Sequence, residues 1–159
     1  MKKLIAVAVL AATSALAASA FAGVTAKAPF KATYSGQTTE KVSGQNINAL
    51  AKGTGTATVL GRSTISGTVQ GTTANPPCSP FAGPGVIRSA KGTLKVNVAN
   101  ARGCAASEQD QNNISVSGTV KVKSGTGKLS KAKGSFHFSG RYDRQSGYFK
   151  VKLTGTLTY

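Results

Sequence analysis

The chain is poor in the residues that most often build catalytic and metal sites, since its 159 residues include one histidine, two cysteines, four acidic residues and no tryptophan. The histidine, His137, lies between Phe136 and Phe138, so the alternation of a strand would turn its ring outward. One histidine cannot supply a histidine-based metal site, and no Ser-His-Asp triad is available. We therefore assign no catalytic residue and expect neither a metal ion nor another cofactor.

Long apolar runs are missing beyond the N-terminus, and no later stretch approaches the roughly 18 residues of a membrane-spanning helix. Lys2 and Lys3 precede an apolar run over residues 4–16, and Ala20-Phe21-Ala22 places small residues where a signal peptidase reads them. We interpret residues 1–22 as a cleaved signal-peptide helix of a bacterial protein and residues 23–159 as one mature domain. This predicts a secreted or periplasmic protein without a transmembrane segment.

Acidic residues are scarce, so the charge of the chain is strongly one-sided. Cleavage would remove Lys2 and Lys3 and leave 18 basic residues against four acidic ones, a net charge of +14. Such a protein attracts polyanions. Cys78 and Cys104 are the only cysteines, and an exported chain meets an oxidising environment. We therefore expect them to form one disulfide.

Glycine is abundant and recurs in one pattern, between two large apolar residues at a spacing of two. Alternation places these glycines on the apolar, inward face of a strand. A glycine there suits a sheet that bends sharply, or a place where another side chain fills the space. The pattern predicts a small barrel. Its four occurrences are Ile65-x-Gly67-x-Val69, Val116-x-Gly118-x-Val120, Phe138-x-Gly140-x-Tyr142 and Leu153-x-Gly155-x-Leu157.

Apolar and polar residues alternate along most of the mature chain, which is typical of strands with one buried face. We predict an all-β fold, a small closed antiparallel β-barrel of seven or eight strands, because closure leaves no exposed edge. The expected strands carry Phe30 to Tyr34, Gly53 to Leu60, Arg62 to Gln70, Leu94 to Val98, Ile114 to Val122, Phe136 to Tyr142 and Phe149 to Tyr159. Residues 42–50 could form either a strand or a loop.

Two segments interrupt the alternation, and each carries one cysteine. Thr72 to Ala90 is rich in proline and glycine, and Asn100 to Asn113 holds two of the four acids, so we expect two long connections. A single strand would separate them and place their roots at opposite ends of the barrel. The expected disulfide would then require one connection to fold back along the barrel.

Glycine-rich turns give the chain a resemblance to a known family. The segments are Gly53 to Arg62, Ser124 to Gly134, and the strand pair Ser135 to Tyr142 and Tyr148 to Leu157. On these the chain resembles the allene oxide cyclase barrel-like group, bacterial secreted relatives of allene oxide cyclases and dirigent proteins. The resemblance covers about residues 53–157 and implies a β-barrel. Val59 stands where bacterial members often carry a histidine, and no catalytic residue of the plant enzymes can be placed on this chain.

Basic side chains on the last three expected strands alternate outward and form one positive face, which we term the basic wall. A solvated surface is one interpretation; electrostatic docking on an anionic glycan or lipid of the cell envelope is the other. We expect no nucleic-acid partner, because single-strand binding needs exposed aromatic residues and Tyr148 alone shares this face. The basic wall comprises Lys121, Lys123, His137, Arg141, Lys150 and Lys152.

The inward side chains of these strands form a second candidate site. They either pack the core or, if bending does not absorb the inward glycines, line a cavity for a small apolar ligand. They are Phe136, Phe138, Tyr142, Phe149, Val151 and Leu153. The sequence thus predicts a non-catalytic protein that binds an anionic envelope component or a small apolar molecule. The alternative is an enzyme of the cyclase or isomerase type, whose cavity would fold an apolar substrate.

Overall fold

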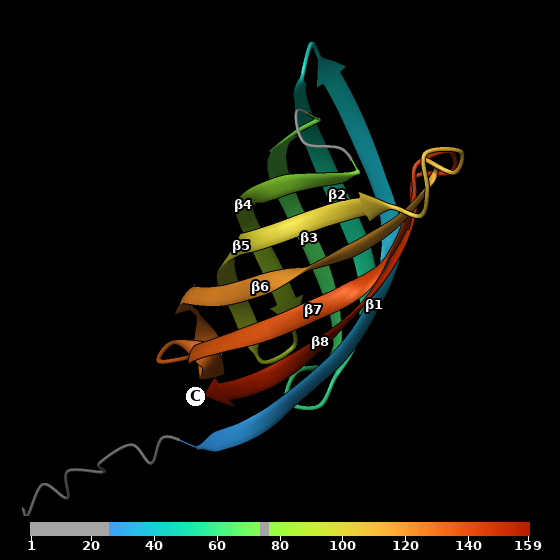
Figure 1. Ribbon diagram of the computed structural model, residues 1–159. Coiled ribbons are helices and arrows are strands. Elements are labelled where there is room, and N and C mark those ends of the chain that lie inside the picture. The colour runs from blue at the N-terminus through green and yellow to red at the C-terminus, as the bar shows by residue number, and fades with distance from the viewer. Residues whose placement is uncertain (1–25, 74–76) are drawn as a thin grey trace, which may run out of the picture.

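The computed structural model describes residues 26–73 and 77–159, which form eight strands and one short 3-10 helix (Figure 1). The signal segment predicted at residues 1–22 lies outside the described residues. In chain order the elements are β1 (Lys27–Ser43), β2 (Asn46–Ala57), β3 (Gly61–Thr72), β4 (Cys78–Ser89), β5 (Gly92–Ala105), β6 (Asn113–Gly125), η1 (Gly127–Leu129), β7 (Lys133–Asp143) and β8 (Tyr148–Thr158).

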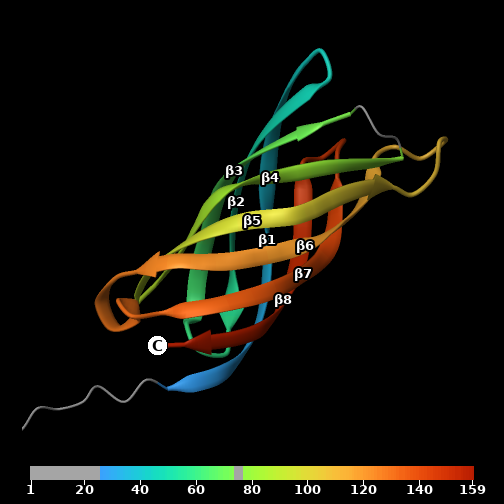
Figure 2. The ribbon, with the colours of Figure 1, turned by 60° about the vertical axis from the view of Figure 1, so that its left-hand side comes forward.

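The strands form one closed antiparallel barrel in which each strand pairs with the next along the chain (Figure 2). The first and last strands close it, with β1 pairing β8 from Lys27 opposite Thr158 to Gln37 opposite Tyr148. The prediction of an all-β closed barrel of seven or eight strands is therefore confirmed. Among the described residues, no helix has the length and apolar character needed to cross a bilayer.

Two inward glycines lie against the backbone of a neighbouring strand, which leaves no room for a side chain. A Cβ on Gly155 would overlap the carbonyl oxygen of Ser135, and one on Gly140 would overlap that of Lys150. At Gly118 the space is taken by a neighbour, because an added Cβ would lie 2.7 Å from the ring of Phe138. The expected use of glycine as room for another side chain is therefore seen at Gly118.

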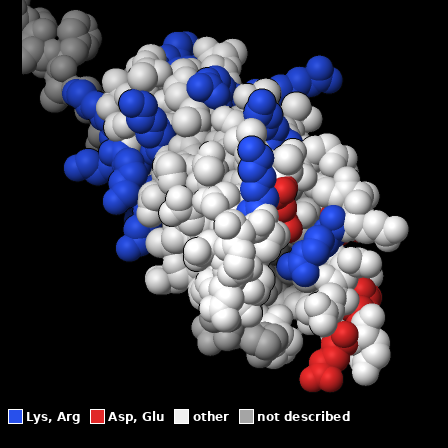
Figure 3. Space-filling view, turned by 90° about the horizontal axis from the view of Figure 1, so that it is seen from above, with Lys and Arg blue, Asp and Glu red and all other residues white. Residues whose placement is uncertain are grey.

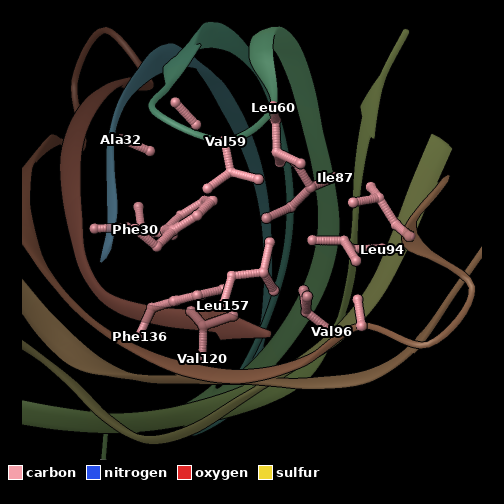
Figure 4. Packing of buried hydrophobic residues seen from close by; sticks show 14 of the residues in the cluster. Phe30, Ala32, Val59, Leu60, Ile87, Leu94, Val96, Val120, Phe136 and Leu157 are labelled. Atoms are coloured by element: carbon pink, nitrogen blue, oxygen red, sulfur yellow. The ribbon is translucent and has the colours of Figure 1, made fainter. Parts of the chain in front are cut away.

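One end of the barrel is packed solid, and we term it the closed end. The β2–β3 turn folds Val59 and Leu60 into the interior (Figure 4). Leu129 of η1 belongs to the same buried cluster. The rings of Phe30 and Phe136 stack there with centroids 4.1 Å apart. Both residues pair with Gly155, one from each side, so the rings meet over the position that lacks a side chain.

The opposite end carries the other four connections, and we term it the open end. The β1–β2 hairpin rises past the rest of the rim in both ribbon views (Figures 1 and 2). Residues 42–50, which the sequence left between strand and loop, form this hairpin, with Val42 opposite Ile47. Because the hairpin projects, residues on its inner face are less covered than those deeper in the barrel, and Val42 is 62% exposed.

The expectation of a long connection from Thr72 to Ala90 is wrong, because most of this segment is strand β4. Pro80 and Pro84 flank a register shift between Phe81 and Gly83. A proline cannot donate a ladder hydrogen bond, and such an irregularity is one of the few places where a sheet tolerates it. The second expected connection is also shorter than predicted, because β5 continues to Ala105.

The expected disulfide between Cys78 and Cys104 is present. The two cysteines are directly opposed on β4 and β5, so neither segment folds back along the barrel. The expectation that the roots of the two connections lie at opposite ends arises because the sequence does not predict strand β4. With that strand in place, both cysteines belong to the open end.

Candidate ligand-binding cavity and outer basic surface

The open half of the barrel encloses a cavity of about 240 Å³ that opens between the connections of the open end. Its walls come from all eight strands and are almost entirely apolar. Ile87, Val96, Val120 and Leu153 belong both to the cavity wall and to the packed core, and so mark its floor. Other wall residues include Ile47, Ala49, Ile65, Val69, Phe81, Val86, Val98, Ile114 and Val116.

Five of the six inward residues singled out in the sequence line this cavity, namely Phe138, Tyr142, Phe149, Val151 and Leu153. Phe136 does not, because its ring is fully buried against Phe30 in the closed end. Strand β7 therefore runs from packed core at Phe136 to cavity wall at Phe138. The interior is thus both a core and a cavity, each confined to one half of the barrel.

The mouth of the cavity carries three polar side chains from two strands and a turn. Glu40 of β1 is 19% exposed, and its carboxylate lies 3.7 Å from Nε of Arg144 in the β7–β8 turn. The Tyr142 phenol on β7 lies close enough to the same carboxylate for Glu40 to raise the pKa of the phenol. Polar or charged partners of this kind lower the free-energy cost of placing a polar or ionised group at the edge of an apolar space. Together Glu40, Tyr142 and Arg144 form what we term the polar trio.

Arg144 also connects the separate parts of the rim. Its Nη1 donates to the Gln111 carbonyl oxygen at 3.4 Å, and its backbone N–H donates to the Asn112 carbonyl oxygen at 2.9 Å. The β5–β6 connection is itself held by Asp110, whose carboxylate accepts hydrogen bonds from the Asn113 side chain and backbone. These bonds lower the pKa of Asp110 below its usual range. The rim is therefore cross-linked by polar contacts.

Burial at the mouth raises the pKa of Tyr142 to about 12, and the nearby charge of Glu40 adds to the rise. The phenol therefore stays protonated and able to donate across the physiological range. A pKa that is raised in the folded state stabilises the fold fully below the ordinary tyrosine value of about 10. That contribution is lost as the pH rises through about 12.

Titration of the tyrosines by their absorbance as phenolates should include a step near pH 12 that is missing in Tyr142→Phe. Glu40→Gln should move this step to lower pH, because it removes the negative charge that opposes ionisation. Tyr148→Phe, at an exposed position, serves as the control and should leave the step in place. An unchanged step in Glu40→Gln would contradict the assigned contact.

The six residues of the basic wall are exposed on the outer surface of β6, β7 and β8. Arg141 lies directly opposite Lys150 on the neighbouring strand. Like charges in such a pair disfavour folding. The six residues of the basic wall therefore lie together on the outer surface, and their mutual repulsion slightly lowers the stability of the fold. Their positions do not indicate which partner would bind them.

Charge also differs between the two ends of the barrel, a feature that the sequence analysis missed. All four acidic residues lie at the open end, on β1, in the β5–β6 connection and at the end of β7. Acidic side chains are accordingly visible in the view onto that end (Figure 3). Eleven of the basic residues are exposed in the closed half, and we term them the basic cap: Lys27, Lys31, Arg62, Arg88, Lys91, Lys95, Lys121, Lys123, Lys128, Lys131 and Lys133.

The polar trio as a group is not among the expected sites, although the sequence holds a signal for it. The inward face expected for the first strand ends at Tyr34, yet the same parity continues through Thr38 to Glu40. Arg144 likewise follows Tyr142 by two residues. What could not be read from the sequence is that these two inward ends meet across the barrel mouth.

The geometry of the described residues offers no group of three or more histidine, cysteine or acidic side chains that could hold a metal ion. A scan against protein-family models and searches of curated proteins and of solved structures found no match to this chain. The resemblance to the allene oxide cyclase barrel-like group therefore stays a prediction. The function is therefore inferred from the cavity, the polar trio and the charges of the outer surface.

Proposed function

We propose that this protein is a non-catalytic binding protein that holds a small, mostly apolar molecule in the open half of its barrel. The observation that carries the proposal is the contrast within one interior, where the closed half is packed and the open half leaves about 240 Å³. An apolar cavity of about 150 Å³ accommodates benzene. By that measure this cavity suits a molecule of roughly ten carbon atoms.

The walls and the mouth favour different parts of such a molecule. Transfer of apolar surface from water to these walls is favourable by roughly 25 cal/mol per Å². At the mouth the Glu40 carboxylate accepts, and the Arg144 guanidinium donates, hydrogen bonds. A ligand with an apolar body and one polar end matches this arrangement. Secretion and an envelope location, predicted from residues 1–22, would make an extracellular or periplasmic small molecule the natural candidate.

The enzyme of cyclase or isomerase type remains the second candidate, on the strength of the polar trio. Glu40 and Tyr142 are an acid–base pair at the edge of an apolar cavity, where a substrate could be folded and a proton moved. Binding is favoured over catalysis because the Glu40 carboxylate is paired with the Arg144 guanidinium. Conversion of a bound molecule that stops in Glu40→Gln would favour the enzyme.

Isothermal titration calorimetry with 2-naphthol, an apolar ring system with one hydroxyl group, tests the binding proposal. We expect saturable binding, and about fivefold weaker binding of naphthalene, which cannot form the hydrogen bond worth about 1 kcal/mol at the mouth. Val98→Trp, which places an indole ring inside the cavity, should weaken 2-naphthol binding at least about tenfold.

Thr154→Trp is the matched control, because it adds the same ring on the exposed outer face of β8 and should leave the affinity unchanged. Equal affinity of the Val98→Trp variant and the unmodified protein would place the ligand outside the barrel. Failure of both probes to bind the unmodified protein would overturn the proposal. Native mass spectrometry of protein from its own host would identify a retained ligand.

A further inference from the structure

The basic cap is an unneutralised positive surface at the end of the barrel remote from the cavity mouth. The acidic residues all lie at the open end, and the ion pair found among the described residues, Arg144 with Glu40, lies there too. One cap ammonium, that of Lys91, is held by the Val59 carbonyl oxygen at 2.6 Å. The cap therefore carries its charge without an acidic side chain nearby.

Several cap residues are brought together from distant parts of the chain. The backbone N–H of Lys128 donates to the Lys91 carbonyl oxygen at 2.9 Å, which joins η1 to the β4–β5 turn. Lys133 and Lys27 both pair with Thr158, one from each side, so β8 lies between them. This assembly costs electrostatic repulsion that the fold does not relieve.

The features surrounding the cap narrow the class of partner. The large apolar side chains exposed among the described residues, Val42, Leu50 and Tyr148, lie on the open half or at its strand ends. The cap thus lacks both the exposed aromatics that stack on single-stranded nucleic acid and an apolar wedge for insertion. The cavity described above also lies at the other end of the barrel.

We propose that the basic cap docks the protein on the surface of a bilayer containing anionic phospholipids, with the cavity mouth facing away from the membrane. An end that is rich in lysine and lacks acidic side chains suits a planar layer of phosphate headgroups. Each lysine near such a surface contributes about 1 kcal/mol. The contact is electrostatic, so salt weakens it by shortening the Debye length from about 10 Å at 0.1 M to about 3 Å at 1 M.

Co-sedimentation with phosphatidylcholine vesicles, with and without phosphatidylglycerol, tests the docking. We expect binding to the vesicles with phosphatidylglycerol alone, and its loss in 1 M salt. Neutralising three cap residues in Lys128→Gln/Lys131→Gln/Lys133→Gln should weaken this binding about 100-fold. The matched control, Arg141→Gln/Lys150→Gln/Lys152→Gln, removes the same charge from the basic wall outside the cap and should weaken it less than about fivefold.

The outcomes separate the cap from the alternatives. Equal losses in the two triple variants would mean that net charge, and not the cap, drives binding. A larger loss in the control would assign the membrane to the basic wall. Absence of binding to phosphatidylglycerol vesicles, or tighter cap-dependent binding to an acidic polysaccharide or an oligonucleotide, would overturn the bilayer as the partner.

Orientation can be measured because the chain has no tryptophan of its own. Ser130→Trp places a single indole beside η1 in the cap, and Val42→Trp places one at the tip of the β1–β2 hairpin. With vesicles of brominated phosphatidylglycerol, the Ser130→Trp fluorescence should be quenched more strongly than that of Val42→Trp. The reverse order would show that the mouth, and not the cap, faces the bilayer.

Discussion

Replacing Phe136 by alanine is expected to lower the free energy of unfolding by about 3–5 kcal/mol. The ring is fully buried, it stacks on Phe30 with centroids 4.1 Å apart, and it lies over Gly155, which has no side chain to fill a void. The lost burial, the lost ring contact and the new cavity all act in the same direction. Urea unfolding followed by circular dichroism measures the change.

Phe138→Ala provides the control, because it removes the same side chain from the same face of the same strand, two residues away. Phe138 borders the existing cavity, so its removal enlarges a space that is already open and creates no sealed void. We expect a smaller loss of about 2 kcal/mol, together with altered binding of 2-naphthol. Equal losses in the two variants would contradict the division of the interior into a packed and a hollow half.

This division explains how one barrel can be stable and still hold a ligand. The closed half has turns that fold inward, with Val59, Leu60 and Leu129 acting as a plug. In the open half, Arg144 of the β7–β8 turn bonds to the β5–β6 connection and pairs with Glu40 of β1. Stability and binding therefore depend on different residues of the same strands, and variants of one half should leave the other largely intact.

The architecture could be predicted because its signal is local. Alternation along β1, β6, β7 and β8 sets which residues face inward. Strand β4 was not predicted, because proline and glycine are typical of loops and this strand contains Pro80, Gly83, Pro84 and Gly85. Its strand conformation depends on pairing with β3 and β5 on both sides, a tertiary effect that local preference does not report.

The candidate site was only half predictable for a related reason. Parity places side chains inside or outside the barrel, and it identified five cavity residues on the C-terminal strands. It does not say how deep each strand sits relative to its neighbours, so Phe136 could not be told from Phe138. Glu40 contacts Arg144 because β8 pairs with β1 and so brings the β7–β8 turn close to the first strand. The residues of the cap lie together because successive turns alternate between the two ends of the barrel.

Removal of the disulfide in Cys78→Ala/Cys104→Ala is expected to lower the free energy of unfolding by about 3 kcal/mol, since the bridge closes a loop between cysteines 26 residues apart. The effect acts chiefly on the unfolded chain, which gains freedom when the bridge is absent. Neither cysteine borders the cavity, so the affinity for 2-naphthol should not change. Urea unfolding and calorimetry on the same variant measure the two quantities.

Reduction of the unmodified protein supplies the internal control for this variant. Reduced protein should match the double variant in its unfolding midpoint, and dithiothreitol should not shift the variant at all. The far-ultraviolet circular dichroism should be the same in all three, because the backbone ladder between β4 and β5 continues on to Ser89 and Gly92 without the bridge. Loss of the strand spectrum on reduction would mean that the proline-containing β4 depends on the disulfide for its place in the barrel. Loss of 2-naphthol binding alone would instead mean that the bridge fixes the shape of the mouth.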